Sequence, residues 1–288
     1  MRKFSKCLLV ATIGLLAPLA AAGTGQAITG GDADGNAHPN VGILVFYTAE
    51  GRFRCTGTLV TSTVVLTAAH CADGTLGKVI VSFDSEIAQS APSGIPVAAD
   101  PTKGYTKAPG VVNGKTWYAG TAYRSPAYSN FTDMDNWNDY AVVKLDKAIS
   151  GIAPAKLAPL NYMNGFEQPA LNKTLFDLVG YGTRIDKPAA GPQKPQALSF
   201  PLIRRATTAP GQKLTVQLIQ MNGNINDTRG GGGTCFGDSG GPAFLNGYVV
   251  GVTSYGLTSN CRYIDGYQRV DIGVAQAFLA SFGVYPAA

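Results

Sequence analysis

The stretch "GTCFGDSGGPAF", residues 233–244, places one serine between an aspartate and two glycines, with a cysteine four residues before that serine. A turn needs one or two glycines, so this density indicates a backbone in conformations that a Cβ would forbid. The stretch fits a flexible glycine-rich loop, a phosphate-binding loop, or a loop that presents Ser239 as a nucleophile. A phosphate-binding loop has a Lys followed by Ser or Thr after its glycines, and none follows here. The rest of the chain has to decide between the other two.

The composition indicates an all-β globular protein with many turns. Only 14% of the 288 residues are charged, Gly occurs 36 times, and β-branched and aromatic residues recur in short runs. A disordered chain would carry more charge and fewer large apolar side chains.

Short runs with strand character follow one another between turn-rich segments, and this pattern predicts a sandwich or barrels. We interpret 146–161, with its prolines, as the linker between two halves. The turn-rich segments 84–115 and 184–196 are long, and such loops carry specificity or are decoration, which is our interpretation of 84–115. The strand-like runs are 41–47, 57–69, 78–83, 139–145, 175–182, 213–220, 248–256 and 267–271.

The best helix candidate is the C-terminal segment 271–283. Asp271 can cap its start, and Gly283 supplies a stop signal. Phe278 and Phe282 lie four residues apart, on one face of the predicted helix.

Residues 1–27 have the features of a secretory signal peptide, with a basic start, an apolar run and then small residues. Cleavage is expected after Ala27; the alternative is cleavage after Ala22, with a propeptide 23–27 removed later. We therefore expect a secreted, extracellular protein of residues 28–288. The apolar run is too short for a confident membrane span, and no other segment approaches that length, so no membrane association is expected after the leader is removed.

The charge balance excludes a typical nucleic-acid-binding protein. The full chain has 23 Lys+Arg and 18 Asp+Glu, a formal net charge of +5. The leader holds three basic and no acidic residues, so the remaining chain has 20 − 18 = +2. A nucleic-acid-binding domain usually has a much stronger basic excess.

The cysteine count predicts two disulfides in the secreted chain. Cys7 lies in the leader, and an even number of cysteines remains, for which three pairings exist. His38 and His70 do not combine with these cysteines at zinc-finger spacing, so we expect no metal and no other cofactor. The four remaining cysteines are Cys55, Cys71, Cys235 and Cys261.

Two further residues combine with Ser239 in a chemically meaningful order. His70 closes the apolar run "VVLTAAHC", and Asp139 opens the run "DYAVVKL". Taken alone, each is more simply explained as a structural residue. In the order His, Asp, Ser they suit nucleophilic acyl transfer, because imidazole can take the serine proton and a buried carboxylate can orient the imidazole. A glycine-rich turn can aim backbone N–H groups at the negative oxygen that develops on the substrate.

The blocks "TAAHC", "ND" before "YAVVKL", and "CFGDSGGP" resemble the three signature blocks of the trypsin/chymotrypsin family of secreted serine peptidases, in the family's order. In particular, the chain resembles the compact trypsin-like peptidases of bacteria. The resemblance covers nearly all of the chain after the leader. It implies an all-β fold of two antiparallel six-stranded β-barrels, about 28–150 and about 151–270, followed by a C-terminal helix at about 271–283.

The resemblance implies a role for each block. His70 would be the general base, Asp139 its orienting carboxylate and Ser239 the nucleophile. The N–H groups of Gly237 and Ser239 would form the oxyanion hole. The implied disulfides join Cys55 to Cys71 and Cys235 to Cys261.

The sequence "ITGG", residues 28–31, resembles the new N-terminus that activates family members. There the freed α-ammonium of Ile28 would pair with the acid before the serine, Asp238. No Arg or Lys precedes Ile28, so tryptic activation is not encoded, and we expect signal peptidase to release the active enzyme directly.

Specificity departs from the usual family pattern. Members that cut after Arg or Lys usually carry an acid six residues before the serine, where this chain has Gly233. Counting back from "YQRVD" places Asp265 on the opposite pocket wall, which predicts a preference for Arg and Lys with tolerance of bulky apolar residues. A one-residue shift would instead put Gly266 in the pocket and Asp265 on the solvated rim. The other implied pocket residues are Thr234, Ser254, Tyr255 and Gly256.

Two rival functions are considered. One is a binding protein on the same fold whose catalytic residues have decayed, but His70, Asp139 and Ser239 are all present. The other is a helix-rich esterase with a "GDS" motif, although in those enzymes the motif lies near the N-terminus. As partners we expect protein or peptide substrates and proteinaceous inhibitors, with the protein itself a monomer.

Overall fold

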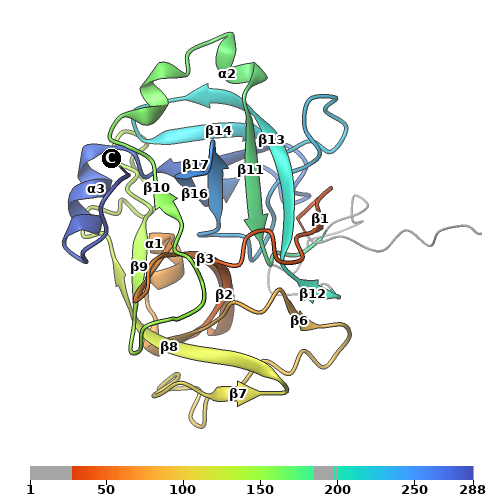
Figure 1. The fold of residues 1–288 in the computed structure, drawn as a ribbon, viewed down its shortest axis with the longest axis vertical. Helices are drawn as coiled ribbons and strands as arrows, with labels where there is room; N and C mark the ends of the chain where they lie inside the picture. Colours follow the sequence, from red (N-terminus) through yellow and green to blue (C-terminus); the bar gives the residue numbers. More distant parts are fainter. Residues whose placement is uncertain (1–27, 185–197, 199, 288) are drawn as a thin grey trace, which may run out of the picture.

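The computed structural model describes residues 28–184, 198 and 200–287. The predicted leader, with Cys7 and both cleavage sites, and the segment 185–196 lie outside the described residues. Most strands from the first half of the chain lie in the lower part of Figure 1, and most strands from the second half lie in the upper part.

Six antiparallel strands close the first barrel, in the order β5-β2-β3-β4-β9-β8 and back to β5. The short strand β7 (Gly110–Val112) extends it by pairing with β8. Most residues of β2 and β4 are buried, as the apolar runs predict. The barrel strands are β2 (Val41–Thr48), β3 (Gly51–Thr61), β4 (Val64–Thr67), β5 (Leu76–Ser82), β8 (Lys115–Arg124) and β9 (Ala141–Leu145).

Six further antiparallel strands close the second barrel, in the order β13-β11-β15-β16-β17-β14 and back to β13. Two short strands lie outside this ring: β1 (Asp32–Ala33) pairs with β13, and β10 (Lys156–Leu157) runs parallel to β16. The predicted fold class, two six-stranded barrels, is therefore confirmed. The barrel strands are β11 (Leu175–Gly180), β13 (Arg205–Leu214), β14 (Leu218–Asn222), β15 (Pro242–Leu245), β16 (Tyr248–Gly256) and β17 (Ile264–Arg269).

The described residues contain few helices, and all are short: α1 (Ala69–Ala72), the 3₁₀ turn η1 (Tyr162–Gly165), α2 (Ala170–Lys173) and α3 (Gly273–Ala280). The C-terminal helix α3 is present but shorter than the predicted 271–283. The predicted cap is wrong, because the N-cap position is Ile272. The Asp271 carboxylate instead accepts a hydrogen bond from the Met163 amide at 2.8 Å and pairs with Arg269 at 2.8 Å.

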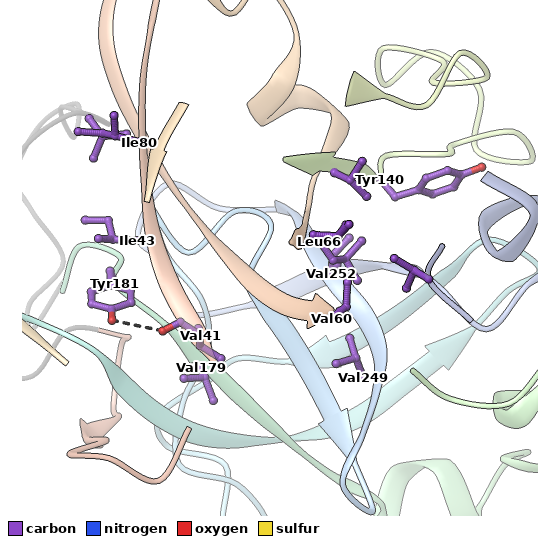
Figure 2. Close-up of a cluster of buried hydrophobic side chains, with 14 of the residues drawn as sticks. Val41, Ile43, Val60, Leu66, Ile80, Tyr140, Val179, Tyr181, Val249 and Val252 are labelled. Carbon is purple, nitrogen blue, oxygen red and sulfur yellow. Dashed lines mark hydrogen bonds between the residues drawn. The ribbon is translucent and has the colours of Figure 1, made fainter. Parts of the chain in front are cut away.

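The two barrels share a buried apolar core, part of which Figure 2 shows. Val41 and Leu66 of the first barrel lie in one cluster with Val179 and Val252 of the second. The Tyr181 hydroxyl donates across this boundary to the Val41 carbonyl at 3.3 Å (Figure 2). The core therefore fixes the two barrels against each other, and residues at the ends of their strands meet at the junction.

Helix α3 follows the second barrel but packs on the first. The Phe278 ring lies 5.4 Å from Tyr140, and the Phe282 ring lies 5.3 Å from Tyr123. The two rings lie 5.2 Å apart on the same side, although Phe282 follows the end of the helix. The helix thus ties the end of the chain back to the first half.

The segment 84–115 is packed against the first barrel. It contains β6 (Glu86–Ala88), which pairs with β12 (Leu202–Ile203). The Ala98 amide donates to the Tyr47 hydroxyl at 3.3 Å, and the ring of Tyr105 lies 5.2 Å from that of Tyr47.

Candidate active site

His70 lies in the helical turn α1 just after β4, and Asp139 lies in the loop just before β9, the neighbouring strand of the first barrel. Strand β4 pairs with β9 so that Thr67 lies opposite Ala141. His70 follows Thr67 by three residues, and Asp139 precedes Ala141 by two. The fully buried Asp139 accepts from His70 Nδ1 at 2.8 Å through Oδ2, and from the His70 amide at 2.9 Å through Oδ1. The carboxylate therefore holds the imidazole in one orientation.

The second barrel completes the surroundings of Asp139. The hydroxyl of Ser254, in β16, donates to Asp139 Oδ2 at 2.6 Å and accepts from Trp137 Nε1 at 2.8 Å. The Asp139 amide donates to Gln268 Oε1 at 2.9 Å. A buried carboxylate with this many donors is fully satisfied, as a buried charge requires.

Ser239 lies in a tight turn just before β15. Its carbonyl accepts from the Thr56 amide at 2.9 Å, which ties the turn to the first barrel. The next residue must be glycine, because Gly240 has φ +77° and a Cβ there would lie 2.0 Å from Thr67 Oγ1. Gly237 has φ +102°, where L side chains are strained. The glycine density of this stretch therefore reflects both positive φ and close approach of the two barrels.

Ser239, His70 and Gly237 line one cleft of about 500 Å³, here called the catalytic cleft. Ile95, from the segment 84–115, also lines it, so part of that segment borders the cleft. The Phe131 ring lies 5.5 Å from the His70 ring.

Asp238 is buried at the junction of the barrels. Its carboxylate accepts from the Gly182 amide at 2.7 Å and from the Cys235 amide at 2.9 Å. Burial raises the pKa of Asp238 to about 6, against these two hydrogen bonds. Ile28 is also fully buried, and the next residue, Thr29, accepts from the Gly233 amide at 3.0 Å. The segment that begins at Ile28 thus lies beside the serine loop. The hydrogen bonds to the Asp238 carboxylate come from the amides of Gly182 and Cys235.

A second cavity of about 330 Å³, here called the Asp265 pocket, adjoins Ser239 on another side. Asp265 is 2% exposed and accepts from the Thr234 amide at 2.7 Å and the Thr234 hydroxyl at 3.0 Å. Burial raises the pKa of Asp265 to about 7. The other predicted pocket residues that line the cavity are Ser254, Tyr255 and Gly256.

Gly233 makes room for this acid, because a Cβ there would lie 2.6 Å from Asp265 Oδ2. The alternative with Asp265 on the solvated rim is wrong for this structure, since the carboxylate is buried. Gly266 instead lies under the Tyr255 ring, where a Cβ would come within 2.1 Å of a ring carbon.

Both predicted disulfides are present. Cys55–Cys71 joins β3 to α1, and Cys235–Cys261 joins the serine loop to the wall of the Asp265 pocket. In the described part of the chain, the one group of residue types suited to metal binding is Cys55, His70 and Cys71. The two sulfurs of that group are bonded to each other, so it offers no thiolate ligands.

Three residues around the site escape sequence reasoning. Gln268 lies within an ordinary strand, Phe131 in a loop without a motif, and Arg54 beside Cys55 in β3. The contacts of all three come from folding distant segments together, and no spacing rule predicts them.

Two antiparallel six-stranded barrels, with a carboxylate-bound histidine and a serine facing one cleft, define a two-barrel hydrolase of the serine type. The family model described as Trypsin matches residues 28–276, and the chain belongs to this family. It is a serine-type endopeptidase, whose substrates are proteins or peptides. The helix-rich esterase interpretation is therefore wrong. No helix among the described residues is long and apolar enough to cross a membrane.

Curated relatives agree with this assignment. The chain is 27% identical over 228 residues to Brachyurin from Leptuca pugilator, covering 77% of this chain and 84% of that protein. It is 28% identical over 213 residues to Trypsin-1 from Gadus morhua, covering 72% of each chain.

Solved structures share the fold at low identity. The HL collagenase structure aligns with a TM-score of 0.61 and 18% identity, covering 91% of this chain and 98% of that one. The scabies mite inactivated protease paralogue S-D1 aligns with a TM-score of 0.59 and 17% identity, covering 90% and 100%. An inactivated protease can thus keep this fold, so the fold alone does not define the catalytic residues.

Proposed function

We propose that the protein is a secreted endopeptidase that cleaves peptide bonds with His70, Asp139 and Ser239 through an acyl-enzyme. The observation that carries the proposal is the 2.8 Å hydrogen bond from His70 Nδ1 to the buried Asp139, beside a cleft that Ser239 also lines. That bond keeps the proton on Nδ1, which leaves Nε2 as the ring nitrogen that acts as base.

In the first half of the proposed reaction, His70 takes the Ser239 proton while Oγ attacks the scissile carbonyl carbon. The carbonyl oxygen becomes negative and accepts from the amides of Gly237 and Ser239. His70 then gives its proton to the leaving amine as the carbon–nitrogen bond breaks. In the second half, water attacks the acyl carbon while His70 takes a proton from it; the ester bond to Ser239 Oγ then breaks as His70 returns that proton to Oγ, and the acid product leaves.

Activation is proposed to follow cleavage after Ala27, which frees the Ile28 amine to pair with Asp238. Two observations support this: Ile28 is buried beside the serine loop, and Asp238 is a buried carboxylate that benefits from a cation. Mass spectrometry of the protein secreted into the medium tests the idea. Active enzyme beginning at Ile28 supports it, and active enzyme beginning at Gly23 refutes it.

Specificity is proposed to favour Arg and Lys before the scissile bond, with bulky apolar residues tolerated. The buried Asp265 supports this, because a carboxylate shielded from water attracts a cationic side chain strongly. Arg, Lys, Phe and Leu p-nitroanilides, compared on wild type and Asp265→Ser, provide the test. We expect the variant to lose the preference for Arg and Lys while keeping turnover of Phe. A wild type that prefers Phe, with no change on mutation, rules the acidic pocket out.

Labelling with a serine-directed phosphonate tests the catalytic proposal against a decayed binding protein. We expect mass spectrometry to find the label on Ser239, and His70→Ala to slow labelling strongly. Absence of label on folded protein would show that the machinery is inactive.

A further inference from the structure

Arg54 reaches from the first barrel into the serine loop of the second. It lies in β3, directly before Cys55, and its side chain lines the catalytic cleft. Its Nη2 donates to the Thr183 hydroxyl at 2.7 Å and to the Phe236 carbonyl at 3.4 Å. Its Nε lies 2.9 Å from where a Cβ on Gly237 would stand. The guanidinium therefore fills the space that the glycine leaves.

The Phe236 carbonyl belongs to the same peptide unit as the Gly237 N–H. It also accepts from the Thr183 amide at 2.7 Å, so two donors hold it on one side. In a planar trans peptide the C=O and N–H point in opposite directions. Holding the carbonyl toward Thr183 and Arg54 therefore directs the Gly237 N–H away from them.

This peptide unit needs holding, because glycine reaches both signs of φ with little penalty. Gly237 has φ +102°. The peptide unit between Phe236 and Gly237 could therefore rotate at modest cost if its carbonyl lost its hydrogen-bond donors. Thr183 supplies a backbone donor, which any residue except proline would provide. Arg54 supplies a side-chain donor, which depends on the residue at position 54.

Electrostatics supports the same arrangement. Burial lowers the pKa of Arg54, and the charge of Asp238 raises it again. The Arg54 charge in turn acts against the raised pKa of Asp238, the acid next to the serine. The guanidinium thus interacts favourably with two residues of the serine loop, Phe236 and Asp238.

We propose that Arg54 is a positioning residue, which holds the Phe236 carbonyl from the first barrel and so keeps the Gly237 N–H aimed at the reacting carbonyl oxygen. The proposal rests on the proposed function, in which Gly237 stabilises the oxyanion. An aligned donor matters most when the oxygen is negative, in the transition state. Loss of Arg54 should therefore lower kcat and leave KM nearly unchanged.

The test compares wild type with Arg54→Met and Arg54→Lys on one peptide p-nitroanilide. Lys144→Met, which removes an exposed cation from β9 of the same barrel, is the matched control. We expect Arg54→Met to lower kcat about 10²-fold, as for loss of an oxyanion donor, with KM within about threefold. Affinity for a peptide boronic acid, which forms a tetrahedral adduct, should fall in parallel. Arg54→Lys keeps one donor and should restore part of kcat, and Lys144→Met should resemble wild type.

Thermal unfolding of each variant separates positioning from folding. If Arg54→Met does not fold, Arg54→Lys decides: reduced kcat and boronic acid affinity at unchanged melting temperature support the proposal. Folded Arg54→Met with kcat and boronic acid affinity within threefold of wild type overturns it. A raised KM with unchanged kcat would also contradict it, because that pattern shows the loss of a substrate-binding contact. If the wild type shows no turnover, or if its turnover does not depend on Ser239, the proposed function itself has failed.

Discussion

At the scale of single residues, the size of one side chain at the site and the position of a charge depend on each other. Gly233 lies six residues before Ser239, and the acid of the pocket, Asp265, comes from β17. The two choices are linked, because a side chain on Gly233 would collide with the Asp265 carboxylate. The pocket therefore has one acid, on one wall, at a depth where burial holds its pKa at about 7.

This raised pKa predicts a pH-dependent specificity. Asp265 carries its charge above about pH 7 and loses it as the pH falls, so attraction for a cationic side chain should weaken in acid. The ratio of kcat/KM for an Arg substrate to that for a Phe substrate should rise several-fold from pH 5.5 to 8. Taking the ratio cancels the pH effects on catalysis that both substrates share.

Asp265→Ser serves as the control for this profile. The ratio should then be low and flat across the same range. A wild-type ratio that does not vary with pH would show that Asp265 keeps one charge state throughout.

At the scale of elements, the sequence predicts strands well where apolar runs are uninterrupted. The run 41–47 corresponds to β2, and 248–256 is β16. The run 57–69 in fact contains the end of β3, a turn, β4 and the start of α1, because apolar residues continue through the bend.

Elements without such a run escaped prediction. Strand β13 contains Pro210, Gly211 and Gln212, which are poor strand formers, and its pairing with β11 and β14 overrides their local preference. The run 213–220 is a hairpin between β13 and β14 and not one strand. For the site, motifs identified the chemistry-bearing residues, whereas supports such as Gln268 depend on tertiary contacts that no local pattern encodes.

The Cys55–Cys71 bond is expected to stabilise the element that carries His70. It joins β3 to α1 across a sequence separation of 16. In the chain-entropy model a loop of this size contributes about 3 kcal/mol. The Cys55→Ala/Cys71→Ala double variant should lose about that much free energy of unfolding in urea denaturation. An unchanged midpoint would mean that the loop is equally restricted in the unfolded chain.

At the scale of the whole molecule, one buried arginine connects several segments. Arg204 and the Asp34 side chain are fully buried and pair at 2.6 Å between Nε and Oδ2. The other two guanidinium nitrogens of Arg204 donate to the carbonyls of Gly35, Val41 and Phe83. The network links the start of the described chain to both barrels, as the segments around β1, β2 and β5 converge there.

Removing one partner of this buried pair should be costly. Arg204→Met leaves Asp34 buried without its cation, and the free energy of unfolding should fall by about 3–5 kcal/mol. Urea denaturation at pH 7 measures the loss. The control Asp146→Asn, which breaks the exposed pair with Lys78, should cost no more than about 1 kcal/mol.

The same pair predicts a pH dependence of stability. Burial pushes the pKa of Asp34 upward, but hydrogen bonds from His38 and Arg204 hold it at about 2, below its ordinary value of 3.8. Because the folded pKa is the lower one, the contribution is present above about pH 4 and is lost as the pH falls toward 2. The gap between wild type and Arg204→Met should therefore shrink over that range. A gap that stays constant would contradict this assignment of the charge.

The measurement closest to the central proposal is turnover of a peptide p-nitroanilide by wild type, Ser239→Ala, His70→Ala and the double variant. Residues that act as one unit should each cost about 10⁶ in kcat, and losing both should cost little more. Each variant is checked for folding by thermal unfolding before its kinetics are compared. Folded Ser239→Ala that retains more than about 1% of wild-type turnover would contradict the assignment of Ser239 as the nucleophile.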